Sequence, residues 1–403
     1  MNPSIASPQK SSAIWQLAAF AAGIAASFTT LAVFGRRAAE KNFHPSFTRF
    51  HRDIAPDTKY YPTARELMGI AREKASGGKI LVIVGGNSVL YGVGQPAGHI
   101  WTERLQRELG PAYAVVNFAM RGAGVTDFAA VIAEALRAEF PRQVYLANAS
   151  PTQPSFPDGT ITYRFVFWDA YYKGLLIDDP ERAAAITETY RIRPETIENL
   201  PEQRLRAALD SFLYFGDAWN RFAFERCNTV WTQERFHGLD SFAPRKIYPD
   251  NEPDYLTFPA ANRLFTGPRF DAELGFARDV SLRAFTVGRE GGWEPYQPAW
   301  DQLAQSIGTS MPHSLRARTL IVLTHNSPYY LNKLTPAEQS RDELAHTLSV
   351  QVWQRAGYEA FDCGRDYTVA DYGDRIHLSS TGGDKLAQQI AGEVRRIATK
   401  LHY

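Results

Sequence analysis

Short apolar segments alternate with segments of helical periodicity in this chain, and that alternation constrains the fold most strongly. The apolar segments are KILVIVGG, YAVVNFA and QVYLANA, and helical patterns such as HIWTERLQRELG lie between them. After a long interruption the pattern resumes with RTLIVLTHNSP and YEAFDC, and a helical segment from Thr381 to Leu401 ends it. Strands that alternate with helices form a parallel sheet covered on both faces. The sequence therefore predicts a three-layer α/β fold with a five-stranded parallel sheet.

The interruption spans residues 151–315 and is rich in aromatic residues, as in TYRFVFWDAYYKG. An insertion of this length inside a compact domain is typical of a cap over a site or of a second packing layer. The residues leave both interpretations open. We expect three parts along the chain: an anchor over 1–36, a stalk with one helix over 37–78, and an α/β domain over 79–403 that the insertion interrupts.

The N-terminal segment from Ser11 to Gly35 contains no charged residue. It is long enough to span a bilayer as a helix, for which about 20 residues suffice. Its apolar run exceeds the roughly 7–15 residues of a signal-peptide core, and no small-residue cleavage site follows it. We expect an uncleaved membrane anchor; a buried helix of the fold is the alternative. Positive charges after the segment, at Arg36, Arg37 and Lys41, favour a cytoplasmic body by the positive-inside rule.

Charge and composition exclude one class of partner. The formal net charge is +1, and no basic stripe with interleaved aromatic residues is present. Electrostatic binding of nucleic acid is therefore not expected. Hydrophobic residues make up 44% of the chain and charged residues 22%, which is typical of a globular protein with a sizeable core.

The residues that follow the predicted strands combine a serine, a histidine, an aspartate and several amide groups. Ligands bind at the carboxyl ends of parallel strands, so these groups are expected to share one edge of the sheet. A serine hydroxyl becomes a good nucleophile when a histidine accepts its proton, and a carboxylate orients that histidine. The set is that of acyl transfer through a serine, and it consists of Asn87, Ser88, Gly122, Asn148, His325, Asn326, Asp374 and His377.

Four sequence blocks resemble the SGNH (GDSL-like) hydrolase superfamily. Gly86-Asn87-Ser88 follows the first strand, and VVNFAMRGAG places a glycine at Gly122. LANA retains Asn148 from the third block, and DRIHLSSTGG matches the Asp-x-x-His block fully. Two departures are evident: Asn87 stands where the family has aspartate, and the third block keeps only its asparagine.

The resemblance implies a flavodoxin-like fold and a serine esterase or acyltransferase that needs no metal or organic cofactor. It implies Ser88 as nucleophile, with Asp374 and His377 completing a triad. It implies an oxyanion hole formed by the backbone N–H of Ser88, by Gly122 and by Asn148. Asn87, His325 and Asn326 are weaker candidates for lining the substrate site, because strand-end turns explain them about as well.

The resemblance extends to bacterial envelope proteins that carry one N-terminal span and act on acyl groups of carbohydrates outside the cytoplasmic membrane. It implies an acylated carbohydrate substrate, with acetyl the expected group, a periplasmic or extracellular domain, and a membrane-embedded acyltransferase as partner. Two alternatives stay open: a lipid esterase whose insertion caps the acyl chain, and a non-catalytic scaffold of a polysaccharide-modifying membrane complex.

Overall fold

The computed structural model describes residues 9–39, 48–49, 53–55, 58–59, 64–126, 129–151, 170, 175–176, 212–214, 229–232, 243–246, 268–279, 284–289 and 291–403. Most of the insertion predicted over 151–315 lies outside these residues. The predicted division of the chain into three parts stays a prediction.

A five-stranded parallel sheet organises the described chain, in the order β11-β10-β5-β3-β4. Read from β4, the strands appear in the chain order 2-1-3-4-5, which is the flavodoxin-like arrangement. The predicted fold class is confirmed. The strands are β3 (Ile80–Val84), β4 (Tyr113–Asn117), β5 (Gln143–Ala149), β10 (Thr319–Thr324) and β11 (Glu359–Cys363).

Helices cover both faces of this sheet, and alternate strand residues feed two separate hydrophobic cores. Leu81, Ile83 and Tyr145 lie in one core, whereas Val82, Val84 and Leu146 lie in the other. The first core is covered by α2 (Ala64–Lys74), α5 (Ala129–Ala135), α13 (Gln297–Ser310) and α15 (Pro336–Arg355). The second is covered by α4 (Trp101–Leu109) and α16 (Ser380–Lys400). Side chains of successive strand residues point to opposite faces of the sheet. A strand of consecutive buried apolar residues therefore contributes side chains to both hydrophobic cores.

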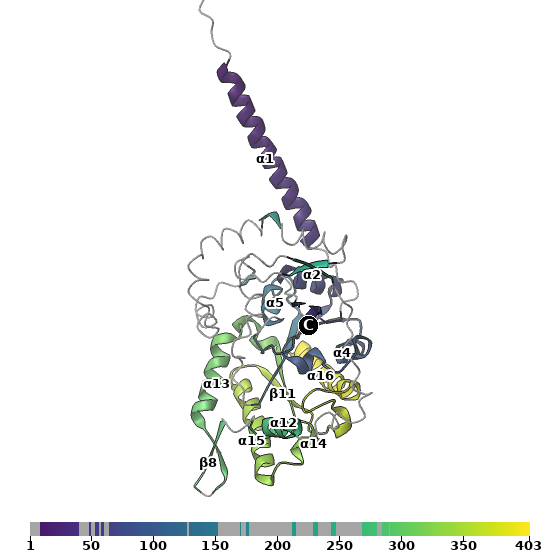
Figure 1. The fold of residues 1–403 in the computed structure, drawn as a ribbon, viewed down its shortest axis with the longest axis vertical. Coiled ribbons are helices and arrows are strands. Elements are labelled where there is room, and N and C mark those ends of the chain that lie inside the picture. Colours follow the sequence, from purple (N-terminus) through teal and green to yellow (C-terminus); the bar gives the residue numbers. More distant parts are fainter. Residues whose placement is uncertain are drawn as a thin grey trace, which may run out of the picture.

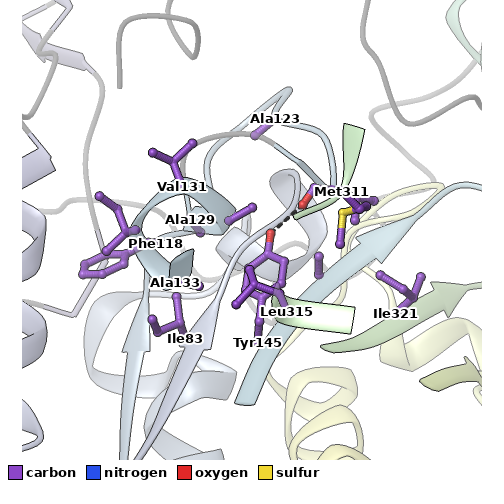
Figure 2. Close-up of a cluster of buried hydrophobic side chains, with 14 of the residues drawn as sticks. Ile83, Phe118, Ala123, Ala129, Val131, Ala133, Tyr145, Met311, Leu315 and Ile321 are labelled. Carbon is purple, nitrogen blue, oxygen red and sulfur yellow. Dashed lines mark hydrogen bonds between the residues drawn. The ribbon is translucent and has the colours of Figure 1, made fainter. Parts of the chain in front are cut away.

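Figure 2 shows part of the first core, where Ile83, Tyr145 and Ile321 from three strands meet Val131 of α5 and Met311. Tyr145 is fully buried, and its hydroxyl donates a hydrogen bond of 2.6 Å to the carbonyl of Val125. This bond satisfies the one polar atom of the ring inside the apolar layer. It also ties the loop that precedes α5 to the central strand β5.

The remaining described elements are short or lie on the periphery. Three two-stranded antiparallel sheets are formed by β1 (Asp53–Ala55) with β2 (Thr58–Lys59), β6 (Thr229–Thr232) with β7 (Ala243–Lys246), and β8 (Phe285–Val287) with β9 (Trp293–Pro295). Short 3₁₀ helices occupy Ala97–His99, His313–Arg318 and Val369–Asp371. The other helices are α1 (Gln9–Ala39), α3 (Ser88–Tyr91), α12 (Pro268–Asp279) and α14 (Pro328–Leu331).

Helix α1 extends away from the rest of the chain (Figure 1). Its segment Ala13–Arg37 is long and apolar enough to cross a membrane, and none of its most apolar window is buried. The alternative of a helix buried in the fold therefore fails for this segment. A membrane span and a signal sequence both satisfy the same test of length and composition.

Helix α15 begins earlier than the sequence pattern indicates. The periodicity predicts a start near Glu343, whereas the helix begins at Pro336. A capping box explains the difference: Thr335 Oγ1 accepts from the N–H of Glu338, and the Glu338 carboxylate accepts from the N–H of Thr335. Pro336 occupies the first turn, where its missing N–H costs nothing.

Candidate active site

Strand β3 delivers Ser88 to the carboxyl edge of the sheet through a tight turn. Gly86 has φ +87°, and a Cβ there would lie 2.8 Å from the backbone nitrogen of Asn148, so the turn requires glycine. Asn87 then caps the short helix α3, its side-chain oxygen accepting from the N–H of Val89 at 2.9 Å. Ser88 is the first residue of that helix.

A closed loop between β11 and α16 carries Asp374 and His377. The N–H of Gly373 donates to the carbonyl of His377 at 2.8 Å, and Tyr372 bridges Leu378. Within the loop, Asp374 Oδ1 accepts from the N–H groups of Ile376 at 2.9 Å and His377 at 2.8 Å. These bonds hold the Asp374 carboxylate and the His377 imidazole on the same side of the loop, although the two residues are three positions apart.

Ser88, His377 and Asp374 form a continuous chain of hydrogen bonds. Ser88 Oγ lies 2.8 Å from His377 Nε2, and His377 Nδ1 lies 2.6 Å from Asp374 Oδ2. The side chains of His377 and Asp374 keep 17% and 18% of their exposure, so the group is reachable from solvent without being surrounded by it. The structure thus brings together the three residues that the sequence predicts as a triad.

The environment keeps Asp374 ionised. Burial by itself raises the pKa of this carboxyl, but the hydrogen bonds and the charge interaction with His377, together with the N–H of Ile376, outweigh it. The pKa of Asp374 therefore lies below its ordinary value. An ionised Asp374 fixes the imidazole with its proton on Nδ1 and leaves the lone pair of Nε2 directed at Ser88.

The predicted oxyanion-hole groups of Ser88 and Gly122 belong to two segments that a backbone hydrogen bond joins, and their role stays a prediction. The N–H of Ser88 has no acceptor within α3, because first-turn N–H groups of a helix never do. Gly122 has φ +77° in a turn closed by a bond of 3.0 Å from the N–H of Ala123 to the carbonyl of Met120. The same loop is tied to the nucleophile turn, since the N–H of Met120 donates to the carbonyl of Gly86 at 3.0 Å.

Asn148 lies within β5 and is paired with Asn87 by two hydrogen bonds. Its Oδ1 accepts from the N–H of Asn87 at 2.9 Å, and its Nδ2 donates to Asn87 Oδ1 at 2.7 Å. Asn87 Oδ1 also accepts from the N–H of Val89, and these bonds to backbone N–H groups fix the orientation of both amides. Since Nδ2 carries two protons, one is left to donate elsewhere. The assignment of Asn148 to an oxyanion hole stays a prediction.

The structure places the weaker candidates around the site with different partners. Asn87 lies in the turn between β3 and Ser88, where its side chain caps α3. Asn326 Oδ1 accepts from Arg375 Nη1 at 2.6 Å, on the loop that carries Asp374. His325 is 3% exposed and stacks on His346 with ring centroids 3.7 Å apart. No described contact joins the His325 side chain to Ser88, Asp374 or His377, and its role in lining a substrate stays a prediction.

Arg375 is a site residue that the sequence did not single out. Its guanidinium pairs with Glu273 of α12 at 2.8 Å, and its carbonyl accepts from the N–H of Ser327 at 2.7 Å. Arg375 lies between Asp374 and His377, so these contacts attach the loop that carries both residues to the end of β10 and to α12. Only its position within the Asp-x-x-His block could have drawn attention to it.

Gln95 and Arg49 also support the nucleophile turn and were not predicted. Gln95 Nε2 donates to the carbonyls of Leu378 and Ser379, and its Oε1 accepts from the N–H of Trp101. Arg49 donates to the carbonyls of Gly92 and Gln95 at 2.6 and 2.9 Å. Gln95 thereby links the segment after Ser88 to the segment after His377. Both side chains are buried, and burial of a polar side chain cannot be read from local sequence.

The parallel sheet has the flavodoxin-like order, with Ser88 after its first strand and the Asp-x-x-His sequence before its last helix. This agrees with the resemblance of the four sequence blocks. No family model matches the sequence, and no curated protein matches it either.

Distant similarity to solved structures is present. An aryl esterase from M. smegmatis in its inhibitor-bound form is 13% identical, with a TM-score of 0.29, covering 79% of this chain and 99% of that one. The carbohydrate acetylesterase Est24 from Sinorhizobium meliloti is 11% identical, with a TM-score of 0.30, covering 79% and 100%. Similarity this distant assigns no activity to the chain.

Proposed function

We propose that this chain is a serine-dependent acyl-ester hydrolase or O-acyltransferase that works through an acyl-enzyme. The observation that carries the proposal is the unbroken hydrogen-bond chain from Ser88 Oγ through His377 to Asp374. A non-catalytic scaffold has no need for this arrangement, so the scaffold alternative is disfavoured.

In the first half-reaction, His377 Nε2 accepts the proton of Ser88 while Oγ attacks the ester carbonyl. The imidazolium that forms is stabilised by ionised Asp374, which stays a carboxylate throughout. The tetrahedral oxyanion is stabilised by the N–H of Ser88, with Gly122 and Asn148 as the other proposed donors. Collapse expels the alcohol, which takes the proton from His377, and leaves the acyl group on Ser88.

In the second half-reaction, water or the hydroxyl of an acceptor attacks the acyl-enzyme and gives its proton to His377 Nε2. The ester bond to Ser88 Oγ then breaks, and Oγ takes that proton back. The product is a free acid in the first case and a new ester in the second. The same three residues can serve both reactions and do not separate them. Exclusion of water from the site decides between them.

As substrate we propose the acetyl ester of a cell-envelope carbohydrate, with a lipid ester as the second candidate. The apolar helix α1 supports a position at a bacterial inner membrane, where envelope polymers are modified. We place the α/β domain on the outer side, with a membrane-embedded acyltransferase as the proposed source of acyl groups. Arg36 and Arg37 in the last turn of α1 favour the opposite orientation, so labelling of the domain in intact cells has to decide it.

A series of p-nitrophenyl esters tests the activity and the acyl group together. The full chain in detergent is expected to hydrolyse the acetate with a higher kcat/KM than the butyrate or octanoate, and the Ser88→Ala variant should be inactive on all three. Rates that increase with the length of the acyl chain would instead favour a lipid ester as the substrate. Equal rates for wild type and Ser88→Ala would contradict the serine mechanism. Formation of an acetylated product when a carbohydrate acceptor is added would identify a transferase.

A further inference from the structure

A buried cluster of two histidines and two aspartates lies between α15 and the ends of β10 and β11. It consists of His325, Asp342, His346 and Asp362, here called the His–Asp cluster. The residues His325, Asp342 and His346 are 3%, 3% and 1% exposed. The proposed acyl transfer uses none of these four side chains. Burying this many titratable groups together is costly unless they serve one another or a bound cation.

The backbone brings the cluster together from three elements. Asp342 and His346 are four residues apart on α15, so they lie on the same face of the helix. His325 directly follows β10, and its ring stacks on that of His346 with an interplanar angle of 8°. Candidate ligand atoms of Asp342, His346 and His325 all lie within 4.8 Å of one another.

We propose that His325, Asp342 and His346 bind one divalent transition-metal ion, for which zinc is the best fit. Zinc prefers imidazole nitrogen and carboxylate oxygen at about 2.0–2.2 Å, and three protein ligands with one further position form a common tetrahedral site. Ligand atoms of such a site are about 3.3 Å apart at those bond lengths. The rings of His325 and His346 are parallel in this structure, so one ring has to turn out of the stack for both lone pairs to point at a single ion.

Asp362 has the position of a residue that orients the ligands. Its Oδ1 lies 2.7 Å from His346 Nδ1, so it accepts the proton of that nitrogen and leaves Nε2 of His346 available to a metal. Metal-bound histidines commonly donate their other N–H to a carboxylate in this way. Arg365 Nε pairs with the other oxygen of Asp362 at 2.8 Å.

Two buried polar atoms of the cluster lack a hydrogen-bond partner within the described chain, and a bound cation would give the Asp342 carboxylate a partner. Among the described residues, Asp342 Oδ1 and His325 Nε2 have no hydrogen-bond partner. Asp362 Oδ1 does lie 3.0 Å from that Nε2 as an ion-pair contact, so the oxygen of Asp342 carries this observation.

The proposed ion would be structural with respect to acyl transfer. It would fasten the end of β10 to α15 at His325. The next residue, Asn326, accepts from Arg375 on the loop that carries Asp374 and His377. Metal binding would therefore stabilise the end of β10 at which that loop is attached, and the site exists whether or not the chain is an acyltransferase.

Zinc and cobalt binding to the full chain in detergent test the proposal. After metal stripping, the wild type is expected to bind one equivalent of Zn²⁺, to unfold at a higher temperature with Zn²⁺, and to give visible Co²⁺ absorption typical of a tetrahedral site. Asp342→Asn should keep the fold and lose at least about tenfold in zinc affinity. His346→Gln should lose the Co²⁺ band.

The matched control is Asp301→Asn, which changes an exposed aspartate hydrogen-bonded to Gln297 and should bind zinc as the wild type does. Folded wild type that binds no more zinc than Asp342→Asn would overturn the proposal. An equal loss of zinc affinity in Asp301→Asn and Asp342→Asn would also overturn it. The cluster would then be a buried network of hydrogen bonds and charges. These readouts do not depend on esterase activity.

Discussion

Asn87 shows how a single residue can depart from a family pattern and keep its local role. The resemblance places aspartate at this position, yet the asparagine oxygen accepts from the N–H of Val89 and from Nδ2 of Asn148. Both bonds need an acceptor and neither needs a charge. Ser88, Asp374 and His377 were readable from the sequence because strand ends and an Asp-x-x-His loop are local patterns. The pairing of Asn87 with Asn148 joins two strands and was not readable.

At Asp374, replacement by asparagine should reduce kcat by roughly 10³- to 10⁴-fold, because the amide favours the wrong histidine tautomer. The pKa of Asp374 is lower in the folded chain than in the unfolded one, where it is about 3.9. Its contribution to stability is therefore present above about pH 4 and is lost as the pH falls through the folded-state pKa. Urea unfolding of both proteins from pH 7 to pH 3 measures this contribution. If the difference in unfolding free energy between wild type and Asp374→Asn increased below pH 4, it would contradict this assignment.

Elements with strong local signals were predicted well, and contacts between distant elements were not. The five strands and α4, which ends at Gly110 with φ +83°, follow from apolar runs and a glycine stop. The early start of α15 depends on a capping box, which the periodicity did not reveal. The contact between α12 of the insertion and the catalytic loop is an ion pair across 102 positions, Glu273 to Arg375. No local pattern indicates such a pair.

The Glu273–Arg375 pair should matter for the catalytic loop. Its side chains retain only 27% and 14% exposure, so Glu273→Ala leaves a partly buried charge without its partner. We expect a loss of about 1–2 kcal/mol in the free energy of unfolding and a decrease of kcat for p-nitrophenyl acetate.

Glu343→Ala is the matched control for that pair. Glu343 pairs with Arg365 at side-chain exposures of 53% and 54%, and exposed pairs contribute about 0–1 kcal/mol. Urea unfolding and steady-state kinetics measure both variants. Equal effects of the two substitutions would show that Glu273 does not hold the loop.

For the whole molecule, the described chain combines an apolar helix with a two-core α/β domain (Figure 1). The helix and the fold class were both predictable, because each depends on hydrophobic patterning over many residues. Most of the insertion over 151–315 lies outside the described residues, so its role stays a prediction. The His–Asp cluster was not predicted: only the spacing of Asp342 and His346 is visible in the sequence, and His325 joins them through the fold.

Helix α1 should attach the protein to lipid. The full chain is expected to float with phospholipid vesicles in a density gradient, because the apolar side chains of Ala13–Arg37 are exposed. A folded chain without residues 1–39 should remain at the bottom of the gradient. Flotation of the shortened chain would show that another surface binds lipid, and absence of the full chain from the vesicle fraction would contradict an anchor.

Covalent labelling with a fluorophosphonate tests the central claim, an activated Ser88, most directly. Intact mass would be measured for the folded full chain and for the Ser88→Ala and His377→Ala variants. One adduct per chain, mapped to Ser88 and lost or greatly slowed in both variants, is the predicted result. An adduct that persists in Ser88→Ala, or no adduct on the folded wild type, would contradict a serine activated by His377 and Asp374.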